Sequence, residues 1–183
     1  MGPQLLAAKL PTISIRFRRD ETLYERGAPA KFIFMVTKGA LYRFTVLPDG
    51  RRLILQFLFP GDVFGYEQSR QHAHTVAALT GDSRVISAGR EALLEASKSD
   101  ARLAHFLFTA AARGEAIARE HSVLLLGRPV VEQLALFLLD MDARLSRRGE
   151  IHLPMRRRQI GDYLGRRIES GSRERFPPST RLK

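Results

Sequence analysis

The sequence predicts an α+β fold in which a strand-rich first part is followed by helices. Three observations lead to this prediction. Residues 21–88 alternate short apolar runs with turn residues. Residues 90–126 contain no proline and are rich in helix-forming residues. Residues 153–173 have the order helix, glycine turn, helix, in a segment crowded with arginine. This last order is typical of a helix-turn-helix that reads DNA.

Three apolar runs in the first part are predicted to be β-strands. They cover residues 32–36, 41–47 and 52–59 and are rich in β-branched and aromatic residues, which favour strands. The sequence Pro-Asp-Gly at residues 48–50 predicts a hairpin turn between the last two runs. Short strands at this spacing predict a sandwich, a roll or a barrel.

The helical middle segment carries a regular stripe that starts at Leu103. Its spacings alternate between four and three residues, and its members are Leu103, Leu107, Ala110, Gly114, Ile117, His121 and Leu124. This heptad repeat is typical of a seam between two helices. The alternative is a helix that packs on the strand-rich part of its own chain. We favour a dimer seam, because the helix is longer than a small roll can cover.

Two further helices are predicted on either side of a short extended link at residues 150–154. Gly127 ends the long helix, and Pro129 suits the first turn of the next helix, which covers residues 130–145. Residues 157–164 form a short helix whose apolar positions are expected to face inward; these are Ile160, Tyr163 and Leu164.

The predicted helix-turn-helix is completed by Gly165 and a second helix. Gly165 forms the turn, the second helix covers residues 168–176, and Pro177 ends it.

Positive charge is concentrated at the C-terminal end of the chain. Residues 144–183 contain twelve Arg and Lys against four Asp and Glu, which gives +8 of the net charge of +11. This distribution predicts a polyanionic partner. The alternative is a solvated basic tail.

The chain contains no cysteine, which excludes disulfides, thiolate-bound zinc and iron–sulfur clusters. Residues 1–19 do not form a secretory signal, because their apolar run is short and is broken by Lys9 and Pro11. No segment reaches the roughly 18 apolar residues of a membrane span. We therefore expect a cytoplasmic protein with no membrane partner.

An enzymatic or metal-binding function is not expected. His72 and His74 form a His-x-His pattern, but the next carboxylates along the chain are Asp82 and Glu91. Because a catalytic metal needs three or four ligands, the two histidines are expected in a solvated strand or loop. No nucleophile elbow, P-loop or dinucleotide-binding pattern is present. We therefore predict no catalytic residues and no metal.

Several segments together resemble the CRP/FNR family of bacterial transcription regulators, and its FixK-like branch in particular. The segments are residues 24–44, 49–65, 120–128, 132–141 and 153–173. The resemblance implies an N-terminal cupin-like β-roll sensor domain at residues 1–98, a dimerisation helix at 99–127 and a winged helix-turn-helix domain at 128–183. It also implies a homodimer that reads a palindromic site in double-stranded DNA, with RNA polymerase as a further partner.

The family's DNA-reading motif, E-x-x-S-R, falls on Glu169, Ser172 and Arg173. Glutamate, serine and arginine can all form hydrogen bonds with base edges in the major groove, so the resemblance implies base contacts for these three residues. The alternative for Glu169 and Arg173 is a surface ion pair one helical turn apart. The expected phosphate contacts come from three residues at the start of the first helix, which are Arg156, Arg157 and Arg158.

The sequence departs from the family pattern after Gly165. Arg167 replaces the usual hydroxyl residue at the start of the recognition helix, and Gly171 replaces an apolar residue inside it. Residues 173–183, which include two prolines, stand where relatives have the wing. We therefore expect an incomplete winged helix-turn-helix that is truncated or frame-shifted relative to its relatives. The alternative function is a truncated dimeric regulatory remnant that has lost specific DNA binding.

The sensor segment is not expected to bind a cyclic nucleotide. Family members that bind one place an arginine before a Ser or Thr in this region, whereas His74 precedes Thr75 here. The guanidinium that would hold the cyclic phosphate is therefore missing. We expect no cofactor and a FixK-like regulator that needs no small effector.

Overall fold

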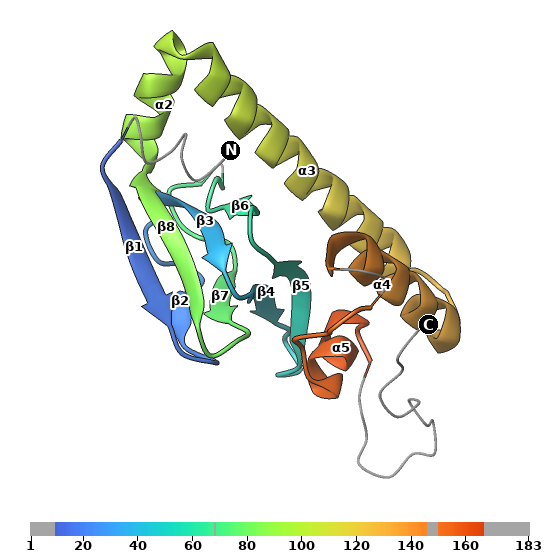
Figure 1. Ribbon diagram of the computed structural model, residues 1–183. Helices are drawn as coiled ribbons and strands as arrows, with labels where there is room; N and C mark the ends of the chain where they lie inside the picture. Colours follow the sequence, from blue (N-terminus) through green and yellow to red (C-terminus); the bar gives the residue numbers. More distant parts are fainter. Residues whose placement is uncertain (1–9, 68, 146–149, 167–183) are drawn as a thin grey trace.

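The computed structural model describes residues 10–67, 69–145 and 150–166. Two antiparallel four-stranded sheets form a roll, and helices follow it along the chain (Figure 1). The first sheet has the order β1 (Thr12–Phe17), β8 (Ser83–Gly89), β3 (Phe32–Lys38), β6 (Val63–Phe64). The second has the order β2 (Thr22–Tyr24), β7 (Thr75–Ala78), β4 (Leu41–Val46), β5 (Arg52–Leu58). The α+β fold class and the three predicted strands are confirmed.

The predicted hairpin turn joins β4 to β5. Gly50 has a φ of +80°, a conformation that glycine adopts without steric cost. Leu47 and Arg51 close the hairpin through a 2.8 Å backbone hydrogen bond. Apolar side chains of both sheets fill the space between them, with Phe34 and Val85 from the first sheet and Leu41 from the second fully or almost fully buried. Of the three architectures that the sequence allowed, the structure is therefore the roll.

The predicted helical middle segment is divided into α2 (Arg90–Ser99) and α3 (Ala101–Leu125). Asp100 separates them with an extended backbone, and its carboxylate accepts hydrogen bonds from the N–H groups of Arg102 and Leu103 at 3.0 and 3.1 Å. This N-cap satisfies two of the otherwise unpaired N–H groups at the start of α3. The run of helix-forming residues at 90–126 is therefore divided into two helices, and α3 lies within the dimerisation helix expected at residues 99–127.

The last two helices follow the prediction closely. α4 (Val130–Leu145) has the predicted bounds, and α5 (Arg157–Tyr163) ends one residue before the predicted end. Gly127, with a φ of +59°, lies between α3 and α4. No helix in the described part of the chain is long and apolar enough to cross a membrane.

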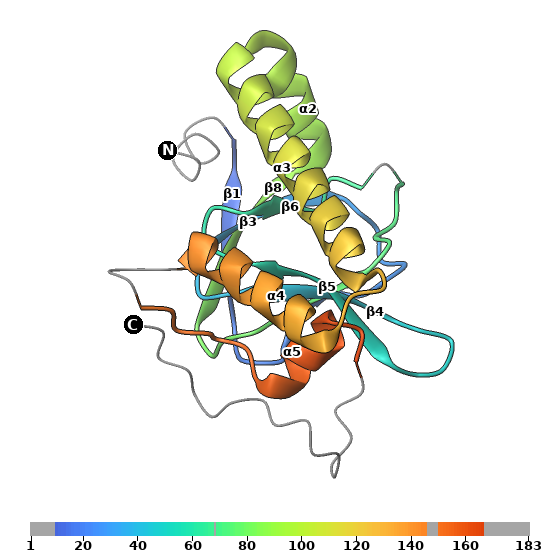
Figure 2. The ribbon, with the colours of Figure 1, turned by 90° about the vertical axis from the view of Figure 1, so that its right-hand side faces the viewer.

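The heptad stripe of α3 faces the roll of its own chain. Leu103 is fully buried, and Leu107 and Ala110 pack partly buried in the same apolar cluster. Gly114 lies against Tyr66 of the roll, so closely that a Cβ at this glycine would be 1.9 Å from the tyrosine hydroxyl. Figures 1 and 2 show α3 running along one side of the roll.

The C-terminal end of the same stripe contacts the other helices. Ile117 is half-buried, whereas His121 and Leu124 are 5 % and 7 % exposed. These contacts match the arrangement in which the helix packs on its own roll, because a side chain buried within one chain has little surface left for a second. The homodimer itself stays a prediction.

The roll and the C-terminal helices share one hydrophobic core. Phe57 of β5, Phe137 and Met141 of α4, and Ile160 and Tyr163 of α5 are all buried in it. The ring centroids of Phe57 and Tyr163 are 5.2 Å apart. Figure 2 shows α4 crossing the view in front of the strands, with α5 next to it. The division into domains at residues 98 and 127 stays a prediction, and the packing across it is continuous.

A buried carboxylate connects the roll to both long helices. Asp62, 7 % exposed, accepts a hydrogen bond from the Phe59 N–H at 2.9 Å. Its carboxylate also lies 3.0 Å from the guanidinium of Arg144 on α4 and 3.6 Å from that of Arg113 on α3. Arg144 donates a second hydrogen bond to the Phe57 carbonyl at 2.8 Å and lies over the Phe59 ring. One anion is thus shared by three elements.

Asp62→Asn should destabilise the chain by roughly 3 kcal/mol, because it removes the nearer and more buried of the two carboxylates that pair with Arg144, at 3.0 Å, and leaves only the more exposed Asp140 at 3.5 Å. The free energy of unfolding from urea titration measures the effect. Glu95→Gln is the matched control, since Glu95 pairs with Lys98 on an exposed surface and such pairs contribute less than about 1 kcal/mol. Equal losses in the two variants would contradict the structural role of Asp62.

Candidate nucleic-acid interface

The first helix of the predicted helix-turn-helix is α5, and its apolar side is buried. Ile160, Tyr163 and Leu164 are between 2 % and 7 % exposed, so their predicted inward orientation is confirmed. At its N-terminus, the Gln159 side chain accepts a hydrogen bond from the Arg156 N–H at 2.9 Å. Because α5 has only seven residues, it depends on this packing more than on its own hydrogen bonds.

The three arginines predicted to contact phosphate lie on the outer side of α5. Arg156, Arg157 and Arg158 are all exposed. Arg156 is 4.0 Å from Asp20 of the roll, a long and solvated pair. No carboxylate partner occurs for Arg157 or Arg158 within the described residues. Exposed guanidinium groups at the start of a helix are well placed to bind phosphate oxygens. The phosphate contacts of the three arginines stay a prediction.

An ion pair fixes α5 to the roll. Arg52 of β5 donates two hydrogen bonds to one carboxylate oxygen of Asp162, at 2.8 and 2.9 Å. The pair is mostly shielded from solvent, and the Arg52 guanidinium lies about 5.5 Å from the ring centroids of Tyr42 and Phe44. Sequence reasoning missed this pair, because the partners are 110 residues apart and no local pattern joins them.

The turn after α5 is held by α4. Gly165 has a φ of +66°, as the predicted glycine turn requires. Arg166 then donates to the Gln133 side chain at 3.1 Å and to the Arg128 carbonyl at 3.2 Å. Gln133 is 1 % exposed and donates in turn to the Leu124 carbonyl at 3.0 Å. The chain therefore leaves the turn from a fixed point.

His121 joins α3 to the end of α5. Its Nε2 is 2.7 Å from the Tyr163 carbonyl oxygen, and its ring stacks on the Tyr163 ring at 4.0 Å between centroids. Burial lowers the pKa of His121, opposed by this backbone hydrogen bond. Burial also raises the pKa of Tyr163. Both groups are therefore uncharged near pH 7.

The residues predicted to contact bases lie outside the described residues. These are Glu169, Ser172 and Arg173, together with the departures at Arg167 and Gly171. Their roles stay predictions. The described part ends at Arg166, one residue after the turn that precedes them.

The two histidines of the His-x-His pattern are less exposed than expected. His72 is only 3 % exposed, stacks on Tyr24 at 3.5 Å and has its Nδ1 3.2 Å from Glu67. His74 is half-buried. The expected solvated loop is therefore wrong for His72, which packs in the roll because Tyr24 covers its ring. Within the described ranges, no three His, Asp or Glu side chains are grouped to hold a metal ion.

Comparison with known proteins gives relatives over most of the chain. The sequence profile of the cyclic nucleotide-binding domain matches residues 14–100. The nitrogen fixation regulation protein FixK of Rhizobium meliloti is 32% identical over 174 residues, which cover 94% of this chain and 77% of that protein. FixK of Bradyrhizobium diazoefficiens is 32% identical over 87% of this chain and 68% of that protein.

A solved structure is similar to this chain over the same part of its length. FixK2 from Bradyrhizobium japonicum has a TM-score of 0.80 and 38% sequence identity, over 86% of this chain and 79% of that chain. The matched part of the chain includes the roll and extends well beyond it.

The residues of the roll do not fit a cyclic phosphate at the position that the resemblance assigns to an arginine. Burial lowers the pKa of His74, with the nearby Arg43 acting in the same direction. The imidazole is therefore neutral near pH 7 and supplies no positive charge. The hydroxyl of Thr75 already accepts a hydrogen bond from the Arg26 N–H at 3.1 Å.

The free energy of unfolding should fall as the pH drops below about 6.5, partly because of His121. The folded chain keeps this buried histidine neutral, whereas the unfolded chain takes up a proton below the ordinary pKa of about 6.5. His121→Gln should therefore reduce the slope of stability against pH between pH 7 and 5. Urea titrations at several pH values measure the slope. His152→Gln, at a 93 % exposed side chain, is the control. An unchanged slope in His121→Gln would contradict the assignment.

Proposed function

This chain belongs to the CRP/FNR family of transcription regulators, in its FixK-like branch, and from this premise we propose that it reads a palindromic DNA site as a homodimer. The family consists of regulators and not of enzymes. The observation that supports the DNA-reading role most directly is the placement of α5. Its apolar side is buried, its arginines are exposed, and the Gly165 turn lies three residues before the expected start of the recognition helix at residue 168.

The proposed mechanism uses two kinds of contact with DNA, one to the backbone phosphates and one to the base edges. Exposed arginines at the start of α5 bind backbone phosphates and set the position of the helix-turn-helix. Glu169, Ser172 and Arg173 then read base edges in the major groove. The positive charge of residues 144–183 adds a sequence-independent attraction that weakens as salt rises. RNA polymerase is the further partner that this family membership implies.

We propose that the dimer forms on the outer face of α3. The inner face packs on the roll, whereas a second row at the same alternating spacing stays mostly exposed. This row consists of Thr109, Ala112, Ala116, Arg119 and Val123. Ala112 and Ala116 are small enough for two helices to approach closely, and Val123 is 49 % exposed. A heptad row of this kind is suitable for a parallel pair of helices.

Selection from a random duplex library should return a palindrome whose half-sites are centred about one helical turn apart. Arg173→Ala should then lower the preference for the selected base at one position per half-site by about 1 to 3 kcal/mol. Competition gel shifts measure this preference. Equal displacement of the protein by the selected duplex and by random DNA would favour the alternative of a regulatory remnant without specific binding.

Ala112→Glu should shift the chain toward the monomer, because it places a carboxylate in the centre of the proposed helix pair. Sedimentation equilibrium measures the dimer dissociation constant. Ala118→Glu is the matched control, since Ala118 is an exposed alanine of the same helix that lies outside the row. If the two substitutions weaken the dimer equally, the outer row is not the seam.

A further inference from the structure

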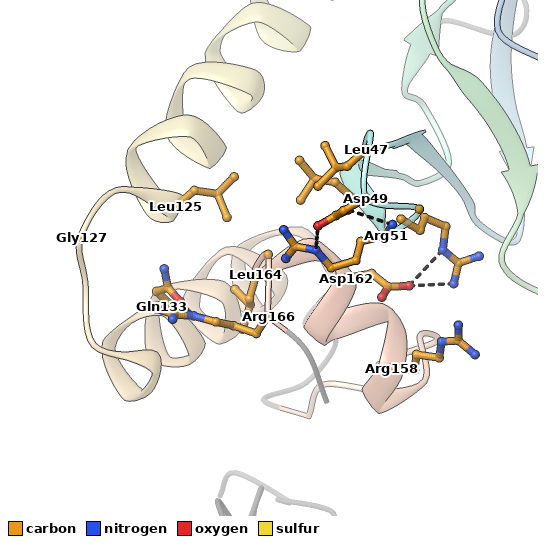
Figure 3. A pocket seen from close by; sticks show the side chains of 14 residues that line it. Leu47, Asp49, Arg51, Leu125, Gly127, Gln133, Arg158, Asp162, Leu164 and Arg166 are labelled. Atoms are coloured by element: carbon orange, nitrogen blue, oxygen red, sulfur yellow. Dashed lines mark hydrogen bonds and ion pairs between the residues drawn. The ribbon is translucent and has the colours of Figure 1, made fainter. Parts of the chain in front are cut away.

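We propose that the groove between the β4–β5 hairpin and the turn after α5 is a binding site for a nucleoside polyphosphate. The groove has a volume of about 1180 Å³. This is slightly above the roughly 300 to 1,000 Å³ of small-molecule sites, so the groove is large enough for a nucleotide. Four separate segments line it: the hairpin at residues 47–53, the end of α3 with the link that follows it, Gln133 of α4, and α5 with its turn. Figure 3 shows side chains of these segments around the shared space. The groove lies outside the roll interior.

The charges that line the groove favour an anion. Four arginines reach it, and two aspartates, Asp49 and Asp162, oppose them. Arg51 pairs with Asp49 of its own turn at 2.5 Å, and Arg52 pairs with Asp162. Two positive charges therefore remain without a carboxylate in the groove.

These two charges belong to Arg158 and Arg166. Arg166 donates only to neutral oxygens, those of the Gln133 side chain and the Arg128 carbonyl. Arg158 is exposed and has no ion pair among the described residues. Guanidinium groups form paired hydrogen bonds with phosphate oxygens. Because the uncompensated charges stand on the α5 side, the phosphates are expected there.

The rest of the groove is apolar. Leu47, Leu53, Leu125 and Leu164 line it. A Cβ placed on Gly165 would lie 3.5 Å from Leu125 and 4.0 Å from Leu53, so these leucines converge at the turn. An apolar floor beside a cationic rim is suitable for a flat base attached to several phosphates, and less suitable for a bare polyanion.

A ligand in this groove would touch the roll and the helix-turn-helix at once. Arg51 belongs to the hairpin, whereas Arg166 holds the turn from which the recognition helix is expected to begin. A bound nucleotide would therefore bias the position of the DNA reader, and this consequence rests on the proposed function. The binding itself does not, so it is measured without DNA.

Calorimetric titration of the full chain with ATP, in the absence of divalent cations, tests the site. The expected result is binding at one site per chain, tighter than that of AMP or inorganic tripolyphosphate. The double variant Arg158→Gln/Arg166→Gln should weaken ATP binding by about tenfold or more. Both side chains are exposed, and circular dichroism verifies that the variant is folded.

The matched control removes two charges at the opposite end of the molecule. Lys98→Gln/Arg102→Gln changes the ends of α2 and α3 that adjoin each other, far from α5 in Figure 1, and should leave ATP affinity unchanged. Three results would overturn the proposal: no binding at millimolar ATP, equal loss in the control, or tripolyphosphate binding as tightly as ATP. A failed palindrome selection would reject the DNA-reading function and leave this result intact.

Discussion

The arrangement of the chain depends on one buried anion. Asp62 leaves the roll at the turn before β6 and meets Arg144 of α4 at 3.0 Å, in a place where both side chains are less than a tenth exposed. A buried charge pair of this kind contributes modestly to net stability but strongly penalises any arrangement that separates its members. Since Arg113 of α3 is also close, the pair fixes how both long helices lie on the roll. The Arg52–Asp162 pair then places α5 in the same frame.

Local signals in the sequence predicted the strands β3, β4 and β5 and the helices α3, α4 and α5, whereas the remaining strands of the roll were not predicted. Gly50, Gly127 and Gly165 take the positive φ that their turns require, and the bounds of α4 follow from Pro129 and the apolar period. The N-cap at Asp100 has no distinct signal in the sequence, because an aspartate in a run of helix formers is as compatible with a surface position as with an N-cap.

The orientation of α3 could not be predicted from its heptad repeat. The repeat identifies an apolar face of the helix, but it does not indicate which surface packs against that face. The deciding feature is Tyr66, which fills the notch at Gly114 from a loop 48 positions earlier in the printed sequence. The ion pairs that hold α5 are equally remote, with partners 110 residues apart for Arg52 and Asp162. The inward side chains of α5 were therefore predictable from the sequence, and the attachment of α5 to the roll was not.

The two faces of α3 and the fixed α5 lead to one account of function. The inner face attaches the helix to the roll, the outer face is the proposed surface for a second chain, and α5 is held against β5 by the Arg52–Asp162 pair. Hydroxyl-radical footprinting on a selected duplex tests this account most directly. The account predicts two protected half-sites about 34 Å apart, related by two-fold symmetry. A single protected half-site, or uniform protection along the duplex, would contradict it.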